Sequence, residues 1–412
     1  MGSMAQKSVL MLCGEFMEAY ETIVPLYFLQ AFSVSVHCVS PGRKTGDKCV
    51  MAAHDLLGLE ACFCYNLSLF FEHSIYSELV VDHLTLNANF HEVIPEQYDA
   101  IIIPGGRFTE LLSTDEKCVS MVARFAELGK IILTSCHSQL LLAAAGILAR
   151  GMKCTAFESM KPFIELSGGS WWQQPGVQTV FDITECVMDG KFISTLGWPT
   201  LGNTLRVLLE SIGSKITCSK ETQPSLLFLI GDCVEDYSIN VPFKAFQALG
   251  CKVDAVSPNK KKGDKCATIV HDLEEGRQLP TEKSSHNFYV TVAWEDVSVD
   301  DYDCIVVPGG RSPELLVMND KAVGLIKKFV EKGKFVAAIG MGNWLLAATG
   351  ALKKKRCASG YGTKVAVKVA GGQILESEQC VTDDKLVTAA TTSDLPAFVH
   401  ALSTALGLSV VF

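Results

Sequence analysis

The sequence lacks any long apolar run. No stretch approaches the roughly 18 apolar residues that a membrane-spanning helix requires, so the chain is not expected to have a membrane partner. Positive charge is also scarce, because 36 Lys and Arg residues stand against 45 Asp and Glu residues, a net charge of −9. Contact with nucleic acid phosphates needs a basic face, so nucleic acid is not an expected partner either.

Cysteine pairs with the usual zinc-ligand spacing are missing. The 16 cysteines are spread through 412 residues that are 48% hydrophobic, whereas disulfide scaffolds are short and secreted. Cys62 and Cys64 are closer together than a typical zinc pair and have no second pair nearby. The sequence therefore predicts reduced thiols, a cytoplasmic location, no metal and no cofactor.

What the chain does contain is a repeat. Residues 12–20 (LCGEFMEAY) return as residues 229–237 (LIGDCVEDY), and residues 104–107 (PGGR) return as 308–311. A period this long indicates a duplicated domain rather than a solenoid. We expect a first domain, a polar linker and a second domain over residues 7–217, 218–224 and 225–412.

The first copy is longer than the second. His54 precedes His83 by 29 residues, while their counterparts His271 and His286 are 15 apart, a difference of 14. The extra residues fall near residues 61–74, an apolar segment without a counterpart. We expect a poorly packed, mobile loop there, and a lid over a site is the alternative.

Short apolar runs alternate with helical patterns. In the first copy strands are predicted at residues 8–12, 33–39, 100–103 and 131–134, and helices at 18–32, 117–128 and 138–145. Strands that are apolar on both faces favour a parallel sheet with helices on both faces, an α/β fold. Sites in such folds lie at the carboxyl ends of the strands.

One strand end carries a cysteine. Cys136 follows the strand at 131–134 and precedes a helix, as in the nucleophile elbow of hydrolases. A helix N-terminus favours thiolate, which predicts a lowered pKa for Cys136. The backbone N–H of His137 and the Gly105–Gly106 turn could together stabilise an oxyanion. A buried structural thiol is the alternative.

These motifs resemble the DJ-1/PfpI superfamily, specifically its tandem-domain plant members related to glutathione-independent glyoxalases. The resemblance rests on Gly14 with residues 21–25 (ETIVP), on residues 104–107 and on residues 135–137 (SCH), and it covers nearly the whole chain. It implies two tandem flavodoxin-like domains of the class I glutamine amidotransferase type.

The resemblance also implies a chemistry. Cys136 is the nucleophile, Glu21 is a protonated carboxyl that hydrogen-bonds the cysteine, and His137 has an acid–base role. The implied substrate is a small 2-oxoaldehyde such as methylglyoxal. Addition of the thiolate to the aldehyde carbon, a proton shift by Glu21 or His137, and hydrolysis would give a 2-hydroxy acid without glutathione.

The second copy departs from this pattern. The repeat aligns Cys136, His137 and Glu21 with residues that cannot run the chemistry, namely Gly340, Met341 and Ser238. We therefore expect an inactive second domain that packs against the first as an intrachain pseudo-dimer, with association into homo-oligomers left open.

The first copy departs as well. Tandem relatives with glyoxalase activity carry Glu-Gly-His-Pro near the end of each domain, where this chain has residues 197–200 (GWPT) and 393–396 (SDLP). Weak activity is therefore expected, and Trp198 is either a core residue or narrows the pocket. His54 and Arg107 recur in the inactive copy as His271 and Arg311, which favours structural roles for them.

Two functions remain open at this point. The first is a glyoxalase or deglycase that acts through Cys136. The second is a non-enzymatic oxidative-stress sensor or chaperone-like protein in which Cys136 is oxidised to a sulfinate held by Glu21. A class I glutaminase fits less well, because the cysteine lacks the flanking glycine of that family and no downstream His-x-Glu follows.

Overall fold

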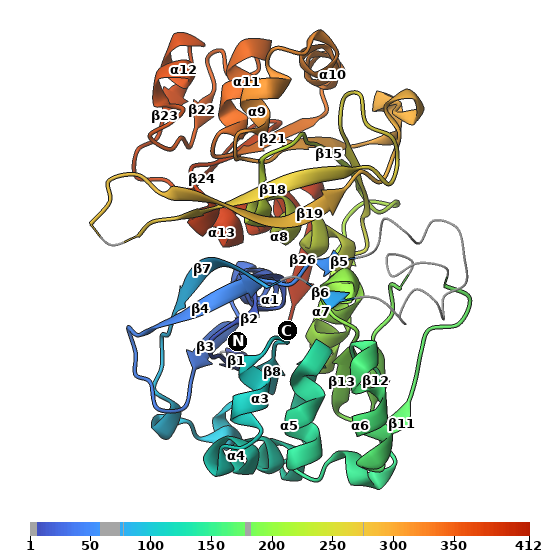
Figure 1. Ribbon diagram of the computed structural model, residues 1–412. Coiled ribbons are helices and arrows are strands. Elements are labelled where there is room, and N and C mark those ends of the chain that lie inside the picture. Colours follow the sequence, from blue (N-terminus) through green and yellow to red (C-terminus); the bar gives the residue numbers. More distant parts are fainter. Residues whose placement is uncertain (1–5, 58–74, 77, 178–182, 275) are drawn as a thin grey trace, which may run out of the picture. The chain divides into compact units, whose positions relative to one another are not determined.

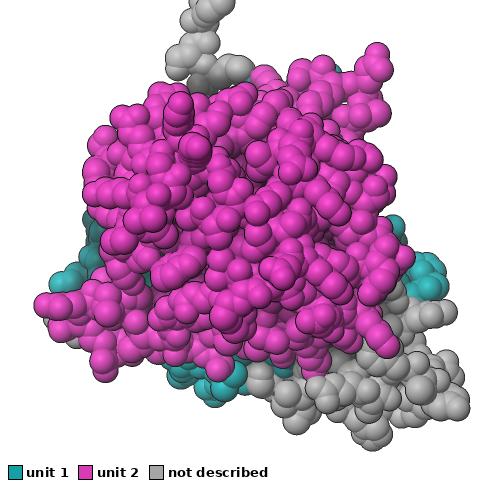
Figure 2. Space-filling view, turned by 90° about the horizontal axis from the view of Figure 1, so that it is seen from above, with its two compact units in different colours: residues 1–215, 412 teal, residues 216–411 magenta. Residues whose placement is uncertain are grey.

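The chain forms two compact units, coloured separately in Figure 2. A computed structural model describes residues 6–57, 75–76, 78–177, 183–274 and 276–412 (Figure 1). The first unit contains residues 1–215 with 412, and the second contains residues 216–411. The predicted loop at residues 61–74, with Cys62 and Cys64, lies outside the described residues.

The first unit is built on a six-stranded sheet in the order β12-β13-β9-β8-β1-β3. Its strands are β1 (Ser8–Leu12), β3 (Ser35–Val39), β8 (Ala100–Ile103), β9 (Ile131–Ser135), β12 (Val187–Asp189) and β13 (Phe192–Thr195). The predicted parallel sheet is confirmed for five of these strands. The edge strand β12 differs, because a tight turn returns it antiparallel to β13.

Helices cover both faces of this sheet (Figure 1). The helix α1 packs with α7, and α4 packs with α5. Their bounds are α1 (Ala19–Ala31), α3 (Phe108–Leu112), α4 (Glu116–Glu127), α5 (Gln139–Ala144), α6 (Lys161–Leu166) and α7 (Leu201–Ser211). In α4 the spacing of Cys118, Val122 and Phe125 places three apolar side chains on one buried face, and the Asp115 carboxylate caps the helix by accepting the Cys118 N–H. Pro25 lies inside α1 without ending it.

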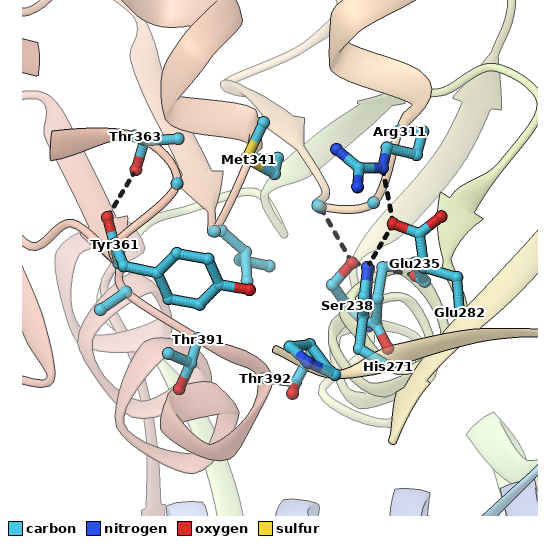
Figure 3. A pocket seen from close by; sticks show the side chains of 18 of the residues that line it. Glu235, Ser238, His271, Glu282, Arg311, Met341, Tyr361, Thr363, Thr391 and Thr392 are labelled. Carbon is cyan, nitrogen blue, oxygen red and sulfur yellow. Dashed lines mark hydrogen bonds and ion pairs between the residues drawn. The ribbon is translucent and has the colours of Figure 1, made fainter. Parts of the chain in front are cut away.

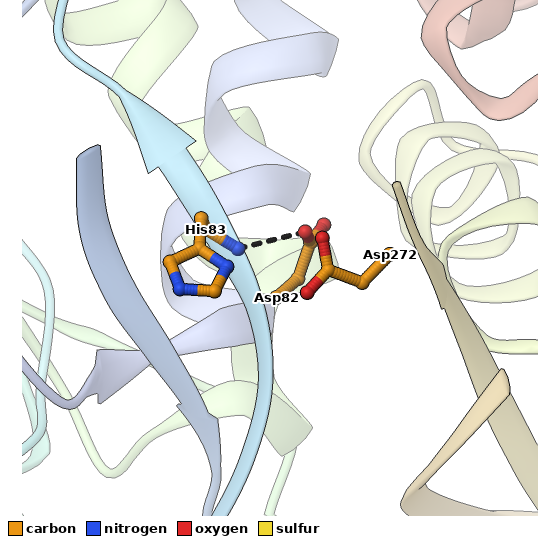
Figure 4. Close-up of side chains that lie close together, drawn as sticks. All are labelled: Asp82, His83 and Asp272. Carbon is orange, nitrogen blue, oxygen red and sulfur yellow. Dashed lines mark hydrogen bonds between the residues drawn. The ribbon is translucent and has the colours of Figure 1, made fainter. Parts of the chain in front are cut away.

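Short strands complete the first unit. A three-stranded side sheet joins β2 (Met17–Glu18), β4 (Lys48–Ala53) and β7 (Leu79–Thr85). The ladder between β4 and β7 shifts register next to Asp82, whose carboxylate accepts the His83 backbone N–H at 2.7 Å (Figure 4). The remaining pairs are β5 (Leu56–Leu57) with β6 (Ile75–Tyr76), and β10 (Lys153–Cys154) with β11 (Ser170–Trp171).

The second unit repeats this architecture, which confirms the duplication. Its main sheet has the equivalent order β17-β15-β20-β21-β25-β24, and β16, β18 and β19 form the side sheet. The strands are β15 (Ser225–Leu229), β16 (Val234–Glu235), β17 (Lys252–Val256), β18 (Lys265–Asp272), β19 (Thr281–Tyr289), β20 (Cys304–Val307), β21 (Phe335–Ile339), β22 (Arg356–Cys357), β23 (Gln373–Ile374), β24 (Cys380–Asp383) and β25 (Leu386–Ala389). The helices are α8 (Asp236–Ala248), α9 (Ser312–Leu316), α10 (Asp320–Glu331), α11 (Gly342–Thr349), α12 (Lys364–Val369) and α13 (Leu395–Leu406).

The boundary between the units falls at residues 215 and 216, just ahead of the predicted linker. The reason is a terminal strand pair, in which β14 (Lys215–Cys218) joins β26 (Leu408–Val411). The Thr217 and Ser409 hydroxyls lie 2.7 Å apart across it. No helix among the described residues is long and apolar enough to cross a membrane.

Candidate active site

The Cys136 elbow forms where β9 ends. Cys136 has φ of +53°, in the left-handed region, and opens a 3-10 turn (Cys136–Ser138) that leads into α5. The turn is held by the Ser138 hydroxyl, which accepts the Ser135 N–H at 2.6 Å and donates to the Ser135 carbonyl at 2.7 Å. The predicted strand-to-helix elbow is confirmed, and it presents Cys136 at the carboxyl end of the sheet.

Glu21 reaches this elbow from the first turn of α1. Its carboxyl is buried, with 2% of the residue exposed, and Oε2 accepts the Gly105 N–H at 2.6 Å. A Cβ added to Gly105 would lie 2.5 Å from Cβ of Cys136 and 2.6 Å from Oε2 of Glu21. Only glycine fits here, and the structure brings the predicted residues Glu21, Gly105 and Cys136 together.

In the Gly105–Gly106 turn, Gly105 has a different role from the one predicted. Because the Gly105 N–H is donated to Glu21, it is not available to an oxyanion, which corrects the prediction for this residue. Gly106 packs against the backbone of Phe16, where no side chain would fit. Gly105 therefore positions the Glu21 carboxyl, and the N–H groups of Gly106 and His137 stay the predicted oxyanion donors.

His137 lies beside the sulfur. Its Nδ1 is 3.1 Å from Sγ of Cys136, and its ring stacks on Phe157 at a centroid distance of 5.6 Å. Burial, assisted by the charge of His54, lowers the pKa of His137 to about 4. The imidazole is therefore neutral near pH 7 and can accept the thiol proton.

The thiol of Cys136 is harder to ionise than its position at an elbow predicts. Burial, followed by the negative charges of Glu21 and Glu18, raises its pKa well above the usual value. The predicted lowering of this pKa is wrong, because α5 has only six residues, whereas burial and the charges of Glu21 and Glu18 disfavour the thiolate. The resting group is a thiol, so a nucleophile must be made by proton transfer.

Glu21 can take part in that transfer. Burial and then the charge of Glu18 raise its pKa from 4.5 to about 7, although the hydrogen bond from Gly105 opposes the shift. A carboxyl with a pKa near the working pH can both give and accept a proton. Gly197, which ends the connection after β13, closes over this carboxyl, since a Cβ there would lie 3.0 Å from Oε1.

Sequence reasoning missed Glu18 as part of the site. Glu18 caps α1, and its Oε1 accepts the Tyr20 N–H at 2.9 Å. Its Oε2 lies 2.9 Å from both the backbone N–H and Nδ1 of His54. The charge of Glu18 acts on both Glu21 and Cys136, so this cap sets the electrostatics of the site. The only signal in the sequence was its recurrence as Glu235.

His54 was predicted to be structural, and it also borders the site. Burial opposes its protonation, but hydrogen bonds to Glu18 and Glu78 outweigh burial and raise its pKa. Oε2 of Glu78 lies 3.4 Å from His54 Nε2 and 2.6 Å from Nε of Arg107, which confirms an ion pair for this arginine. The indole N–H of Trp198 donates to the His54 carbonyl at 3.2 Å, so Trp198 is half-buried at the rim.

The second unit carries the predicted replacements at the same places. Gly340 occupies the elbow with φ of +52°, followed by Met341. The Ser238 hydroxyl accepts the Gly309 N–H at 2.9 Å, just as Glu21 accepts that of Gly105. The described part of this elbow therefore lacks both a thiol and an imidazole.

One predicted correspondence was wrong by two residues. Helix α13 begins at Leu395 as α7 begins at Leu201, so residues 197–200 correspond to 391–394 (TTSD), not to 393–396. The error came from matching prolines, because Pro199 precedes α7 whereas Pro396 lies inside the first turn of α13.

The family follows from comparison with known proteins. The model of the DJ-1/PfpI family matches residues 7–211 and 224–405. The chain belongs to the DJ-1/PfpI family. It is similar to DJ-1 protein homologs F and E of Arabidopsis thaliana, with 84% identity over 413 residues and 68% over 412, covering 100% of both chains in each case. A DJ-1/PfpI relative from Pyrococcus abyssi named as a deglycase is 36% identical over 175 residues, 42% of this chain and 95% of that one.

Proposed function

We propose that the first unit is an enzyme that acts through Cys136 on small 2-oxoaldehydes such as methylglyoxal, or on their early adducts, without glutathione. The observation that carries the proposal is a neutral imidazole 3.1 Å from the half-buried thiol of Cys136, beside a carboxyl with a pKa of about 7. The distant relative named as a deglycase supports an enzymatic role for a domain of this family.

The first half of the proposed reaction makes the carbon–sulfur bond. The thiol proton of Cys136 moves to Nδ1 of His137, and the thiolate sulfur adds to the aldehyde carbon. The electron pair of the C=O bond moves to oxygen, and the predicted donor to the resulting alkoxide is the His137 backbone N–H, which hydrogen-bonds the Cys136 sulfur before the reaction. The alkoxide takes up the proton to give a hemithioacetal.

The second half shifts hydrogen between adjacent carbons. Glu21, in its ionised form, removes the proton from the former aldehyde carbon and returns it to the neighbouring carbon, which converts the hemithioacetal into a thioester. Water then hydrolyses the thioester and releases a 2-hydroxy acid with the free thiol. The overall change adds one water to the oxoaldehyde and needs no oxidant or metal.

The competing hypothesis is an oxidative-stress sensor, which needs the same thiolate of Cys136 as the aldehyde addition does. Oxidation to a sulfinate starts from an accessible thiolate of low pKa. Burial and two neighbouring carboxyl groups raise the pKa of Cys136, which disfavours reaction with peroxide. The half-buried indole of Trp198, which donates to the His54 carbonyl beside this site, is consistent with slow turnover of small substrates only.

The test is lactate formation from methylglyoxal without glutathione. The full chain should form lactate, and Cys136→Ala should form none above the uncatalysed rate. Cys186→Ala removes another half-buried thiol of the first unit and should behave as the parent. Turnover that persists in Cys136→Ala would refute the proposal.

The role of Glu21 is tested separately. Glu21→Gln keeps the shape and cannot shuttle a proton, so turnover should fall about 10²-fold or more. Glu110→Gln makes the same change at an exposed position and should leave turnover unaltered. Activity within a few-fold of the parent would leave His137 as the only base.

A further inference from the structure

The inactive elbow of the second unit opens into a large pocket (Figure 3). Its volume is about 750 Å³, and its lining belongs entirely to the second unit. Gly340 and Met341 form its base, and the hairpin between β18 and β19 contributes Leu279 to its mouth. A cavity of this size is within the range that holds small organic ligands.

The pocket exists because three rings of the first unit have no counterpart. Both units have a short strand that ends in cysteine, Cys154 in β10 and Cys357 in β22, so Phe157 corresponds to Gly360. The elbow matches His137 with Met341, and the turn before the last helix matches Trp198 with Thr392. The rings of His137, Phe157 and Trp198 are replaced by Met341, Gly360 and Thr392.

The charged groups of the pocket are already paired with one another. Nε of Arg311 lies 2.6 Å from Oε1 of Glu282, and Nη1 of Arg311 lies 2.7 Å from Oε1 of Glu314. Burial lowers the pKa of His271, which lies 3.5 Å from Glu282. Burial raises the pKa of Glu235 to about 8, so this carboxyl is neutral near pH 7. One guanidinium against two carboxylates leaves no cation for an anionic ligand.

The rest of the wall is apolar with a few hydroxyls. Leu279 and Tyr361 are 61% and 68% exposed, and Trp344 is also exposed at the mouth. Figure 3 shows the ring of Tyr361 pointing toward the centre, opposite the charged group around Arg311. Thr391 and Thr392 add hydroxyls between the two sides. Exposed apolar side chains around a cavity mark a binding surface.

We propose that this pocket binds, without converting, an uncharged small molecule that has an aromatic or branched apolar body and one hydrogen-bonding group. The apolar body lies against Met341, Tyr361 and Trp344, and the polar group meets the threonine hydroxyls. The bound molecule stays unchanged, because the elbow offers Gly340 and Ser238 in place of a nucleophile and a carboxyl.

The test uses two fluorescent probes with the same ring system on the full chain. N-phenyl-1-naphthylamine is uncharged, and 1-anilinonaphthalene-8-sulfonate adds a sulfonate. The uncharged probe should bind saturably with one site per chain, and the anion should bind at least about tenfold more weakly. Tighter binding of the anion would overturn the proposed ligand class.

Variants locate the site. Thr392→Trp restores the ring carried by Trp198, and Leu279→Asp puts a charge in the mouth at an exposed position that cannot disturb the core. Each should weaken the uncharged probe by about tenfold or more. Leu315→Asp, exposed on α9 and outside the lining, is the control and should bind as the parent does. Equal affinity in all three variants would refute the site.

Discussion

Gly105 lies between Glu21 and Cys136 and holds the candidate site of the first unit together. Its missing side chain lets Glu21 and Cys136 approach each other, and its N–H fixes the carboxyl between α1 and the sheet. Gly309 has the same place in the second unit, but an added Cβ there would come no closer than 3.3 Å to the Ile339 carbonyl oxygen. The same position of the repeat is thus tightly packed in the first unit and less tightly packed in the second.

We expect Gly105→Ala to abolish turnover and to lower the thermal midpoint, because overpacking a filled site costs about 1–3 kcal/mol. Gly309→Ala is the matched control, and it should change the midpoint by less than half as much and leave turnover intact. Thermal unfolding followed by circular dichroism, with lactate formation, measures both. Equal shifts for the two variants would show that the first site is not closely packed.

Glu21 links stability to pH. Its pKa is raised from 4.5 in the unfolded chain to about 7 in the fold, so the folded state holds the proton more tightly. Its stabilising contribution is complete below about pH 4.5 and is lost as pH rises through about 7, up to about 3 kcal/mol.

Glu21→Gln does not titrate and resembles the protonated form. Its thermal midpoint relative to the parent should therefore rise by several degrees between about pH 5 and about pH 8. Glu110→Gln, the same change at an exposed position, is the control. A difference that stays constant with pH would place the pKa of Glu21 near its ordinary value.

Individual site residues could be predicted where a motif carried them. Cys136, Glu21 and Gly105 were found through their motifs, and the structure brings them together. The pKa of Cys136 could not be predicted, because it depends on burial and on Glu18, a helix cap that no motif marks. Local pattern gives the position of a group, while its proton affinity depends on what the whole fold packs around it.

At the scale of elements, the elbow is a strained connection. Cys136 has a left-handed backbone, which costs a non-glycine residue about 1 kcal/mol, and the second unit has glycine at the same point. The strain places the sulfur at the carboxyl end of β9, where Glu21 and His137 reach it. Function and local stability therefore oppose each other at this turn.

The comparison that isolates the strain is between two variants that both lack the sulfur. Cys136→Gly should unfold at a higher temperature than Cys136→Ala, because only glycine adopts this φ freely. The expected difference in the free energy of unfolding is about 1 kcal/mol. The second unit already has glycine at this point, so for the same reason Gly340→Ala should unfold below the parent. Calorimetry of the four proteins decides, and a Cys136→Ala protein more stable than Cys136→Gly would contradict the argument.

Most elements could be predicted, because buried parallel strands are uniformly apolar and the main helices follow a regular pattern. The strands at 8–12 and 100–103 were predicted with the observed bounds. The antiparallel edge strand β12 and the side sheet were not predicted, since short, half-exposed strands have no distinctive pattern. Those missed elements bring Glu18 and His54 to the site.

For the whole molecule, the duplication allows each residue of the first unit to be compared with its equivalent in the second. The ion pairs Arg107–Glu78 and Arg311–Glu282 recur at 2.6 Å in both units, so the scaffold is retained although the residues at the two elbows differ. The units differ at the elbow residue and at the position of Glu21 in α1. They also differ at the three rings of His137, Phe157 and Trp198. Catalysis by the second unit would need several coordinated changes.

We therefore expect Gly340→Cys, placed in the Cys136→Ala protein, to restore no lactate formation. Ser238 and Met341 would still stand where a carboxyl and an imidazole are needed. Labelling of the new thiol with a maleimide confirms that it is present and accessible. Measurable turnover would show that a thiol at this elbow is sufficient, and the one-site model would fail.

The order of the sheet strands also has a consequence for synthesis on the ribosome. Glu21 emerges first, then Gly105 and Cys136, and Gly197 comes last, after β13 has paired beside β9. Until that strand is in place, the edge of β9 is open and nothing covers the Glu21 carboxyl. In a nascent chain Cys136 therefore lacks these neighbours, and Glu21 and Cys136 come together only when nearly the whole first unit has left the exit tunnel.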